Sequence, residues 1–274
     1  MTASSTEAHP VRTLREHTTA LEAAITVCLA APDPKPVHRL RTTTRRIEGQ
    51  LALLATMSGV PHYGKQGRRV RSILTKFRRT AADVRDADVQ IELLEGIESS
   101  SSSHSLRRDS KRLRSYLEAG RKKAAKKLLK LLRARGAELA LMMERLLEAL
   151  GPAESITISS AKLAVLTNHW FLQNVPPDFR SNLDDPDQLH TVRKTAKLAR
   201  YIAENAPKSA TGARRLAKAF ESVQEAGGRW HDWLVLAAFA EDELGESSVL
   251  TKSFTRRCRL ALATYQRRLF DQLD

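Results

Sequence analysis

One short pattern occurs twice in this 274-residue chain, at 37–46 and again at 189–198. Each copy reads as an apolar residue, His, any residue, an apolar residue and Arg, with a further basic residue four positions after that Arg. A second pair of similar segments, 83–89 and 229–235, follows in the same order. Motifs that recur in the same order at one spacing are typical of an internally duplicated chain. We therefore expect two similar halves, residues 1–151 and 152–274.

Both copies of the pattern lie in segments whose apolar residues recur every three or four positions. Over 37–57 the series Val37, Leu40, Ile47, Leu51 and Leu54 predicts an amphipathic helix with one buried face. Prolines and glycines separate further segments of this kind. Helices are predicted at 11–30, 37–57, 67–97 and 106–150, and then at 159–174, 187–205, 209–244 and 247–272. The predicted fold is all-α, with two pseudo-symmetric four-helix bundles that arise from an internal duplication.

Three local features refine this prediction. Asp185 followed by Pro186 is a typical helix start, with an N-cap side chain and a proline in the first helical position. Gly136 is expected to break the long helix at 106–150. The serine-rich segment 99–105 is expected to form a polar loop.

The composition excludes several other classes of protein. Aromatic residues make up only 5% of the chain, which argues against a β-sandwich or barrel, whereas 42% of apolar residues suffice for a packed core. No run approaches the roughly 18 apolar residues of a transmembrane helix, and the first residues lack the features of a signal peptide. Cys28 and Cys258 lie far apart in helical patterns, so free thiols are expected. These observations predict a cytoplasmic protein with no membrane partner.

The formal net charge is +15, and most of the excess lies in the first half. Residues 1–150 hold 29 Lys and Arg against 16 Asp and Glu, whereas residues 151–274 hold 17 against 15. Such an excess is typical of proteins with a polyanionic partner: nucleic acid, an anionic membrane surface or polyphosphate. Charge alone does not choose among these partners.

The basic residues form stripes beside the predicted buried faces. One repeated helix presents His38, Arg41, Arg45 and Glu48, and the other presents His190, Arg193, Lys197 and Arg200. Because the second stripe contains no acid, its like charges repel one another unless an anion compensates them. We interpret the paired stripes as a phosphate-binding surface, with a structural ion-pair role as the alternative. Basic residues on other helices that extend this surface are Lys76, Arg78, Arg85, Arg114, Arg121, Lys218 and Arg256.

The densest basic run, 121–130, goes all the way round its predicted helix. A run of this kind is more typical of a solvated surface than of a specific site. Reversing the charges of Lys122 and Lys123 is therefore expected to weaken anion binding far less than reversing those of Arg45 and Lys197.

The histidines of the two stripes have a predicted protonation state. His38 and His190 are expected in the first turn of their helices, where the helix dipole lowers the pKa of an imidazole. A neutral ring still donates one N–H, to a phosphate oxygen or to a carboxylate. Asp86 and Asp232 are the carboxylates expected to orient the stripes, and direct contact of the histidines with a ligand stays the alternative. His231 replaces Arg85 in the second copy and is expected to share its role.

Signatures of catalysis are missing from the sequence. A carboxylate-bridged metal bundle needs paired Glu-x-x-His motifs, and the nearest match is a single segment from Asp187 to His190. The Walker loop, Gly-x-Gly-x-x-Gly and His-Glu-x-x-His do not occur. The expected function is therefore binding rather than catalysis, without a cofactor and without a metal.

The repeated segments, together with Gln224 and the pair His231 and Asp232, resemble the signatures of the CHAD family, the conserved histidine α-helical domain. The resemblance covers essentially the whole chain. It implies two four-helix bundles with a basic channel between them that binds inorganic polyphosphate, and it implies targeting to polyphosphate granules. The positions that match the family's His and basic residues are His38, Arg41, Arg45, His190, Arg193, Lys197 and Arg200.

Two positions depart from the pattern of the family. Glu48 stands where the second copy has Arg200, which is expected to weaken the first stripe. Gly227 and Gly228 stand where relatives usually have Leu-Gly, which is expected to loosen that helix.

Nucleic-acid binding by a helical protein is the alternative function. It has the same charge requirement but would gain from aromatic side chains on which bases stack. The aromatic residues of the second half mostly occupy core-like positions, as Trp170, Tyr201, Phe220, Trp230 and Trp233 do. Polyphosphate, the ligand that the resemblance implies, is therefore preferred over nucleic acid.

Overall fold

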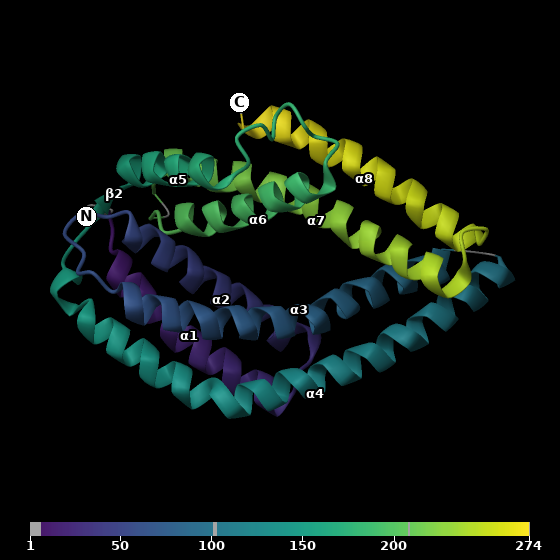
Figure 1. Cartoon of the computed structure of the whole chain (residues 1–274), viewed down its shortest axis with the longest axis horizontal. Helices are drawn as coiled ribbons and strands as arrows, with labels where there is room; N and C mark the ends of the chain where they lie inside the picture. Colours follow the sequence, from purple (N-terminus) through teal and green to yellow (C-terminus); the bar gives the residue numbers. More distant parts are fainter. Residues whose placement is uncertain (1–6, 101–102, 208, 274) are drawn as a thin grey trace.

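The computed structural model describes residues 7–100, 103–207 and 209–273 and consists almost wholly of helices (Figure 1). The first half contains α1 (Pro10–Ala30), α2 (Pro34–Ala55), α3 (Gly64–Ser100), α4 (His104–Ala149) and the short 3₁₀ helix η1 (Gly151–Ala153). The second half contains α5 (Ser160–Asn174), α6 (Pro186–Ala203), α7 (Thr211–Leu244) and α8 (Val249–Leu273). The two-residue strands β1 (Glu7–Ala8) and β2 (Ile158–Ser159) pair antiparallel just before α1 and α5. The all-α prediction is confirmed, and the internal duplication and the domain boundary at 151 stay predictions.

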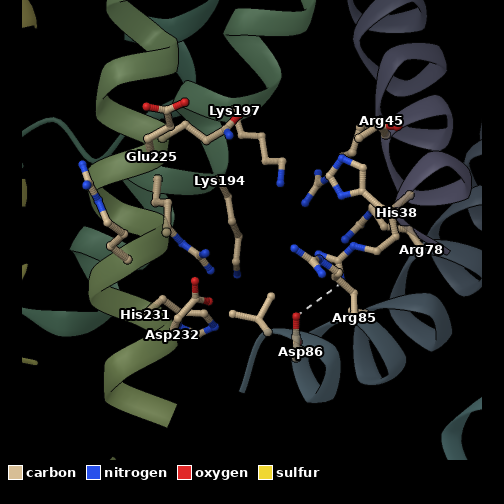
Figure 2. Close-up of a pocket in the computed structure, with 18 of the residues that line it drawn as sticks. His38, Arg45, Arg78, Arg85, Asp86, Lys194, Lys197, Glu225, His231 and Asp232 are labelled. Carbon is tan, nitrogen blue, oxygen red and sulfur yellow. Dashed lines mark hydrogen bonds and ion pairs between the residues drawn. The ribbon is translucent and has the colours of Figure 1, made fainter. Parts of the chain in front are cut away.

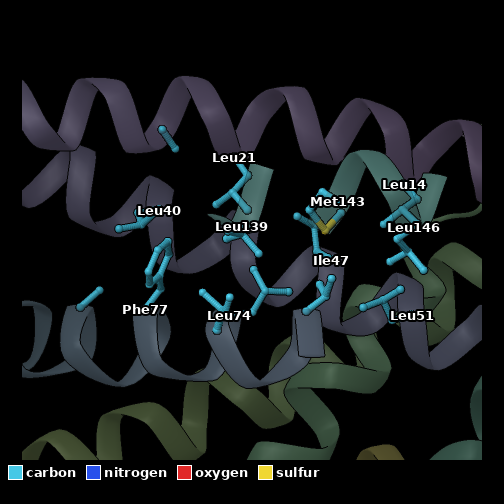
Figure 3. Close-up of a cluster of buried hydrophobic side chains, with 14 of the residues drawn as sticks. Leu14, Leu21, Leu40, Ile47, Leu51, Leu74, Phe77, Leu139, Met143 and Leu146 are labelled. Atoms are coloured by element: carbon cyan, nitrogen blue, oxygen red, sulfur yellow. The ribbon is translucent and has the colours of Figure 1, made fainter. Parts of the chain in front are cut away.

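The helices of the first half share one apolar core (Figure 3). The five residues predicted as the buried face of α2, from Val37 to Leu54, are all in this core and at most 1% exposed. They pack against Leu14 and Leu21 of α1, Phe77 of α3 and Met143 of α4. Full burial of one large apolar side chain contributes about 1.5–3 kcal/mol, so the repeated 3-4 spacing accounts for how α2 is oriented.

Two smaller apolar clusters join the two halves, one at each end of the molecule (Figure 1). Near β2, Leu53 of α2 packs with residues of α5 and α6 that include Ile202. Close approach there needs a glycine, because a Cβ at Gly49 would lie 3.0 Å from the Cβ of Tyr201 on α6. At the other end, the extended parts of α3 and α4 meet α7 and α8 around Leu236 and Phe254. Apolar contacts therefore fix the spacing of the two halves at both ends.

The helix boundaries correct one prediction and confirm another. α2 begins at Pro34, not at residue 37, because prolines are tolerated in a first helical turn whose N–H groups have no intrahelical partner. The predicted start of α6 is confirmed: the Asp185 carboxylate accepts hydrogen bonds from the backbone N–H groups of Asp187 (2.9 Å) and Gln188 (3.3 Å), and Pro186 follows it.

The predicted interruptions are mostly absent. α4 runs unbroken through Gly136, because a single helical glycine costs only about 1 kcal/mol and the buried leucines on both sides of it, Leu132 and Leu139, hold the helix in the core of the first half. α7 is likewise continuous through Gly227 and Gly228. The expected serine loop is shorter than 99–105, because α3 extends to Ser100 and α4 begins at His104; residues 101–102 of that loop lie outside the described residues. In the described part of the chain, every helix is too short or too polar to cross a membrane.

Candidate functional site

A cavity of about 600 Å³ lies between α2 and α3 on one side and α6 and α7 on the other (Figure 2). Its walls contain eight Lys and Arg side chains against three Asp and Glu side chains. The cationic residues are Arg41, Arg45, Arg78, Arg85, Arg193, Lys194, Lys197 and Arg229, and the acidic residues are Asp86, Glu225 and Asp232. The cavity therefore carries a large excess of positive charge.

The repeated pattern places the same residue types on both walls. In α2, Val37 and Leu40 are completely buried in the core, and each is followed directly by a cavity residue, His38 and Arg41. Successive residues of a helix are rotated by about 100°, so the residue after a buried position turns toward the edge of the buried face. Leu189 and Val192 of α6 are buried in the same way and turn His190 and Arg193 into the cavity from the opposite wall.

Carboxylates hold the arginines of the α2 and α3 wall. Glu48, only 11% exposed, forms ion pairs with Arg45 (3.3 Å) and with Arg78 Nε of α3 (3.1 Å). Asp86 of α3 accepts a hydrogen bond from Arg41 (3.4 Å). The expected Arg–Asp contact is thus confirmed for Asp86. Glu48 was expected to weaken the first stripe, but it fixes the orientation of two guanidinium groups.

The α6 and α7 wall contains a pair of neutral histidines. The rings of His190 and His231 lie 5.0 Å apart, and Arg193 donates to Nδ1 of His190 over 3.2 Å. Because arginine has no acceptor atom, Nδ1 must accept, and the proton of neutral His190 lies on Nε2. Burial and the neighbouring cation Arg193 lower the pKa of both histidines to about 4.

The cause of the low histidine pKa differs from the predicted one. Because α2 begins at Pro34, His38 lies in its second turn, and burial followed by the charges of Arg85 and Lys197 lowers its pKa. The direction expected from the helix dipole was therefore right for His38 and His190, but desolvation and nearby cations produce it.

Several cations of the cavity have no carboxylate partner. Among the described residues, Arg85, Arg193, Lys194 and Lys197 form no ion pair with an acid. Burial and the charges of Arg41 and Arg45 lower the pKa of Lys197 to about 7. Within the same described residues, the buried Nε of Arg193 has no hydrogen-bond partner. The site can therefore accept an anion that carries several charges.

The carboxyl group of Asp232, which also lines the cavity, has a shifted pKa. Burial raises the pKa of Asp232 to about 6, although the nearby Arg193 acts to lower it. Within the described structure Asp232 forms neither an ion pair nor a hydrogen bond, so the expected orienting contact is not found for this residue. Its charge acts on Arg193 only from a distance and opposes the lowering of the Arg193 pKa.

Comparison with known proteins assigns the family. The family model of the CHAD domain matches residues 12–241. The chain belongs to the CHAD domain family. Its fold is similar to the CHAD domain from the plant Ricinus communis, with 20% sequence identity, 97% of this chain and 90% of that chain covered, and a TM-score of 0.62. It is also similar to PptA from Streptomyces chartreusis, with 18% identity, 96% and 98% covered, and a TM-score of 0.64. No curated protein sequence matches this chain significantly.

The CHAD cavity brings together most of the residues predicted from the repeats. It gathers His38, Arg41, Arg45, Arg78, Arg85, Asp86, His190, Arg193, Lys197, His231 and Asp232 from four helices. The sequence prediction missed Lys194 and Arg229. Both had a signal, since Lys194 lies four residues after His190, and Arg229 is the first residue of the repeated segment 229–235.

Other predicted residues lie outside the CHAD cavity. Arg200 pairs with Glu204 (2.7 Å) and Glu221 (2.8 Å). Arg114 and Arg121 likewise contact acids of α3, the latter through Asp88. All three arginines therefore form ion pairs with acids, and for Arg200 this is the structural role considered as the alternative for the stripes. The remaining residues are exposed away from the cavity: Lys76, Lys218 and Arg256.

Proposed function

We propose that this CHAD protein binds inorganic polyphosphate, without catalysing a reaction, in the cavity between α2, α3, α6 and α7. The observation that carries the proposal is the excess of cations in the cavity, several of which lack a carboxylate partner. Polyphosphate presents a dense row of charged oxygens and no base edges, so a protein recognises it through charge and hydrogen-bond geometry. The resemblance of the repeated segments to the family points to the same ligand.

The two walls would contribute differently to binding. On one wall, Glu48 and Asp86 hold Arg41, Arg45 and Arg78, so these guanidinium groups are ordered before a ligand arrives. Preordered arginine forks lose little side-chain entropy when they bridge oxygens of neighbouring phosphates. On the other wall, Lys194 and Lys197 extend into the cavity (Figure 2) and supply compact charges. A chain of phosphates between the walls would contact both.

The surroundings of the cavity favour polyphosphate over nucleic acid. Among the described lining residues, Tyr201 is the single Phe, Tyr or Trp, and it is 5% exposed. Trp230 and Phe220 are buried in the core of the second half. Proteins that bind single-stranded nucleic acid gain much of their affinity from exposed aromatic rings, and this cavity does not offer them.

A competition titration tests the proposal. Labelled long-chain polyphosphate is bound to the protein and displaced with single-stranded DNA, duplex DNA or RNA at two salt concentrations. We expect polyphosphate to bind more than about tenfold tighter at about 150 mM salt, where the screening length is short. Equal affinity for all polyanions, lost together at higher salt, would show a nonspecific basic surface and contradict the proposal.

Charge reversal within the cavity localises the binding. The double variant Arg45→Glu and Lys197→Glu should weaken polyphosphate binding at least about a hundredfold, because two charge-assisted hydrogen bonds are lost. Lys122→Glu and Lys126→Glu provide the matched control, since both lysines are exposed on α4 and line no part of the cavity. Similar losses in the two double variants would refute a localised site. Binding at this site would also bring the protein to polyphosphate granules in cells that contain them.

A further inference from the structure

A second groove, of about 340 Å³, adjoins the cavity between α3, α4 and α7. Asp86 lines both the cavity and the groove, so the two spaces meet at this side chain. From α4, the groove is lined by Lys123 and Lys127. This connects the lysine-rich part of α4, at the lower edge of the molecule in Figure 1, to the basic cavity.

The lysines of α4 are free to bind an anion. Lys122, Lys123, Lys126, Lys127 and Lys130 are all exposed, and none of them forms an ion pair with an acid in the described structure. Lys123 and Lys127 are one helical turn apart and share the face that lines the groove. Lys122 and Lys126 have the same spacing but are rotated by about 100°, and they do not line the groove.

The other charges of the groove are mostly neutralised. Arg121 is held by Asp88 and donates to the Pro32 carbonyl oxygen over 3.0 Å. Asp86 is paired with Arg41 of the cavity wall at 3.4 Å. Asp83 is the remaining acid in the lining, against the two unpaired lysines. The groove therefore has a modest positive charge at Lys123 and Lys127, suited to a ligand that is already held nearby.

We infer that a long polyphosphate chain bound in the cavity continues past Asp86 and lies on Lys123 and Lys127, so that this face of α4 makes the protein prefer long chains. The inference rests on the proposed function. The bound part of a chain holds its free part at a high effective concentration beside the groove, so weak contacts there add to the affinity. A short chain that ends inside the cavity gains nothing from α4.

Two pairs of substitutions on α4 test this inference. The variants are Lys123→Gln with Lys127→Gln, and the matched control Lys122→Gln with Lys126→Gln, each titrated with tripolyphosphate and with long-chain polyphosphate. The first pair should weaken long-chain binding roughly thirtyfold, because each lysine beside an anionic surface contributes about fivefold to the affinity. It should leave tripolyphosphate binding unchanged, and the control pair should change neither by more than about twofold.

The salt dependence gives a second readout. Loss of two contacts with a flexible polyanion should reduce the slope of log K against log salt by about 1.4 for the long chain, as for single-stranded nucleic acid. Equal losses in the two lysine pairs, or a loss for tripolyphosphate as well, would overturn the inference. Failure of the proposed function is distinguishable, because then Arg45→Glu with Lys197→Glu would leave the binding of both ligands unchanged.

Discussion

Lys197 is expected to couple anion binding to proton uptake. Burial and the charges of Arg41, Arg45, Arg193 and Arg200 lower the pKa of Lys197 from 10.5 to about 7 in the free protein. At pH 8, about one molecule in ten then has a charged Lys197. A polyanion between the two walls compensates the neighbouring cations, so the pKa of Lys197 rises toward its ordinary value in the complex. We therefore expect uptake of about 0.9 proton per bound chain at pH 8 from this residue, and almost none at pH 6.

The sign of the pH dependence follows from the same linkage. The charged form of Lys197 binds the anion, so the contribution of this residue to the affinity is nearly constant below pH 7. It should then fall about tenfold for each pH unit above 7, until the pKa of Lys197 in the complex is reached. The pKa of Asp232 is already raised to about 6, and a bound anion raises it further. Asp232 therefore also takes up protons on binding, but fewer at pH 8 than Lys197 does.

Isothermal titration calorimetry measures the uptake directly. Titrations at pH 8 in two buffers with different ionisation enthalpies give the number of protons taken up per bound chain. Lys197→Arg is the control, because arginine keeps the positive charge and does not titrate in this range. Its uptake should fall to the small contribution of Asp232. Equal uptake in the wild type and in Lys197→Arg would refute the coupling, as would no uptake in the wild type.

Two further predictions concern residues that support the cavity. Gly227→Ala should lower the free energy of unfolding by about 2 kcal/mol through overpacking and should weaken polyphosphate binding, because the added Cβ would lie 2.9 Å from the Tyr265 ring and 3.1 Å from Arg193 Cδ. The control is Gly228→Ala, because a Cβ at Gly228 would have no atom within 4 Å; this variant should stabilise α7 by up to about 1 kcal/mol. Urea unfolding measures both effects, and equal changes in the free energy of unfolding of the two variants would contradict this reasoning. Glu48→Gln should lower the free energy of unfolding by about 2 kcal/mol, because it leaves Arg45 and Arg78 without their carboxylate. Bound polyphosphate should restore at least half of the lost free energy of unfolding. If the thermal unfolding of Glu48→Gln without a ligand equals that of the wild type, Glu48 does not hold the two guanidinium groups in place.

The sequence was sufficient to predict the helices and which face of each repeated helix is buried. Val37, Leu40 and Ile47 have the spacing of a buried stripe, and all are completely buried. The positions next to such a stripe were predictable for the same reason, because helical geometry relates them to the buried face by a fixed rotation. This is why His38, Arg41, His190 and Arg193 were identified as members of one site.

Periodicity along one helix carries no information about partners on another helix. Arg121 has the same spacing signal as the cavity arginines, but Asp88 of α3 engages it in the structure. Arg200 continues the second stripe of α6, but Glu221 of α7 lies 2.8 Å from it. The sequence could not show that Glu48 reaches Arg78 on α3. Each of these contacts depends on how two helices of the same half are placed relative to one another, and the apolar core of that half sets the placement.

The free-energy cost of a charged Lys197 in the ligand-free cavity also provides a reason for selectivity among polyanions. The lowered pKa of Lys197 corresponds to about 5 kcal/mol for keeping its charge in the free site, at about 1.4 kcal/mol for each pH unit. Burial is the largest cause of this cost, and a ligand recovers the part that comes from repulsion between Lys197 and the neighbouring arginines, to the extent that it places negative charge among Arg41, Arg45 and Lys197 at once. Polyphosphate has no sugar between its phosphates, so more of its charge fits within a cavity of about 600 Å³ than a nucleic-acid backbone could bring there. Discrimination against nucleic acid should therefore weaken in Lys197→Met, in which this repulsion is absent, even though the remaining arginines still attract both ligands.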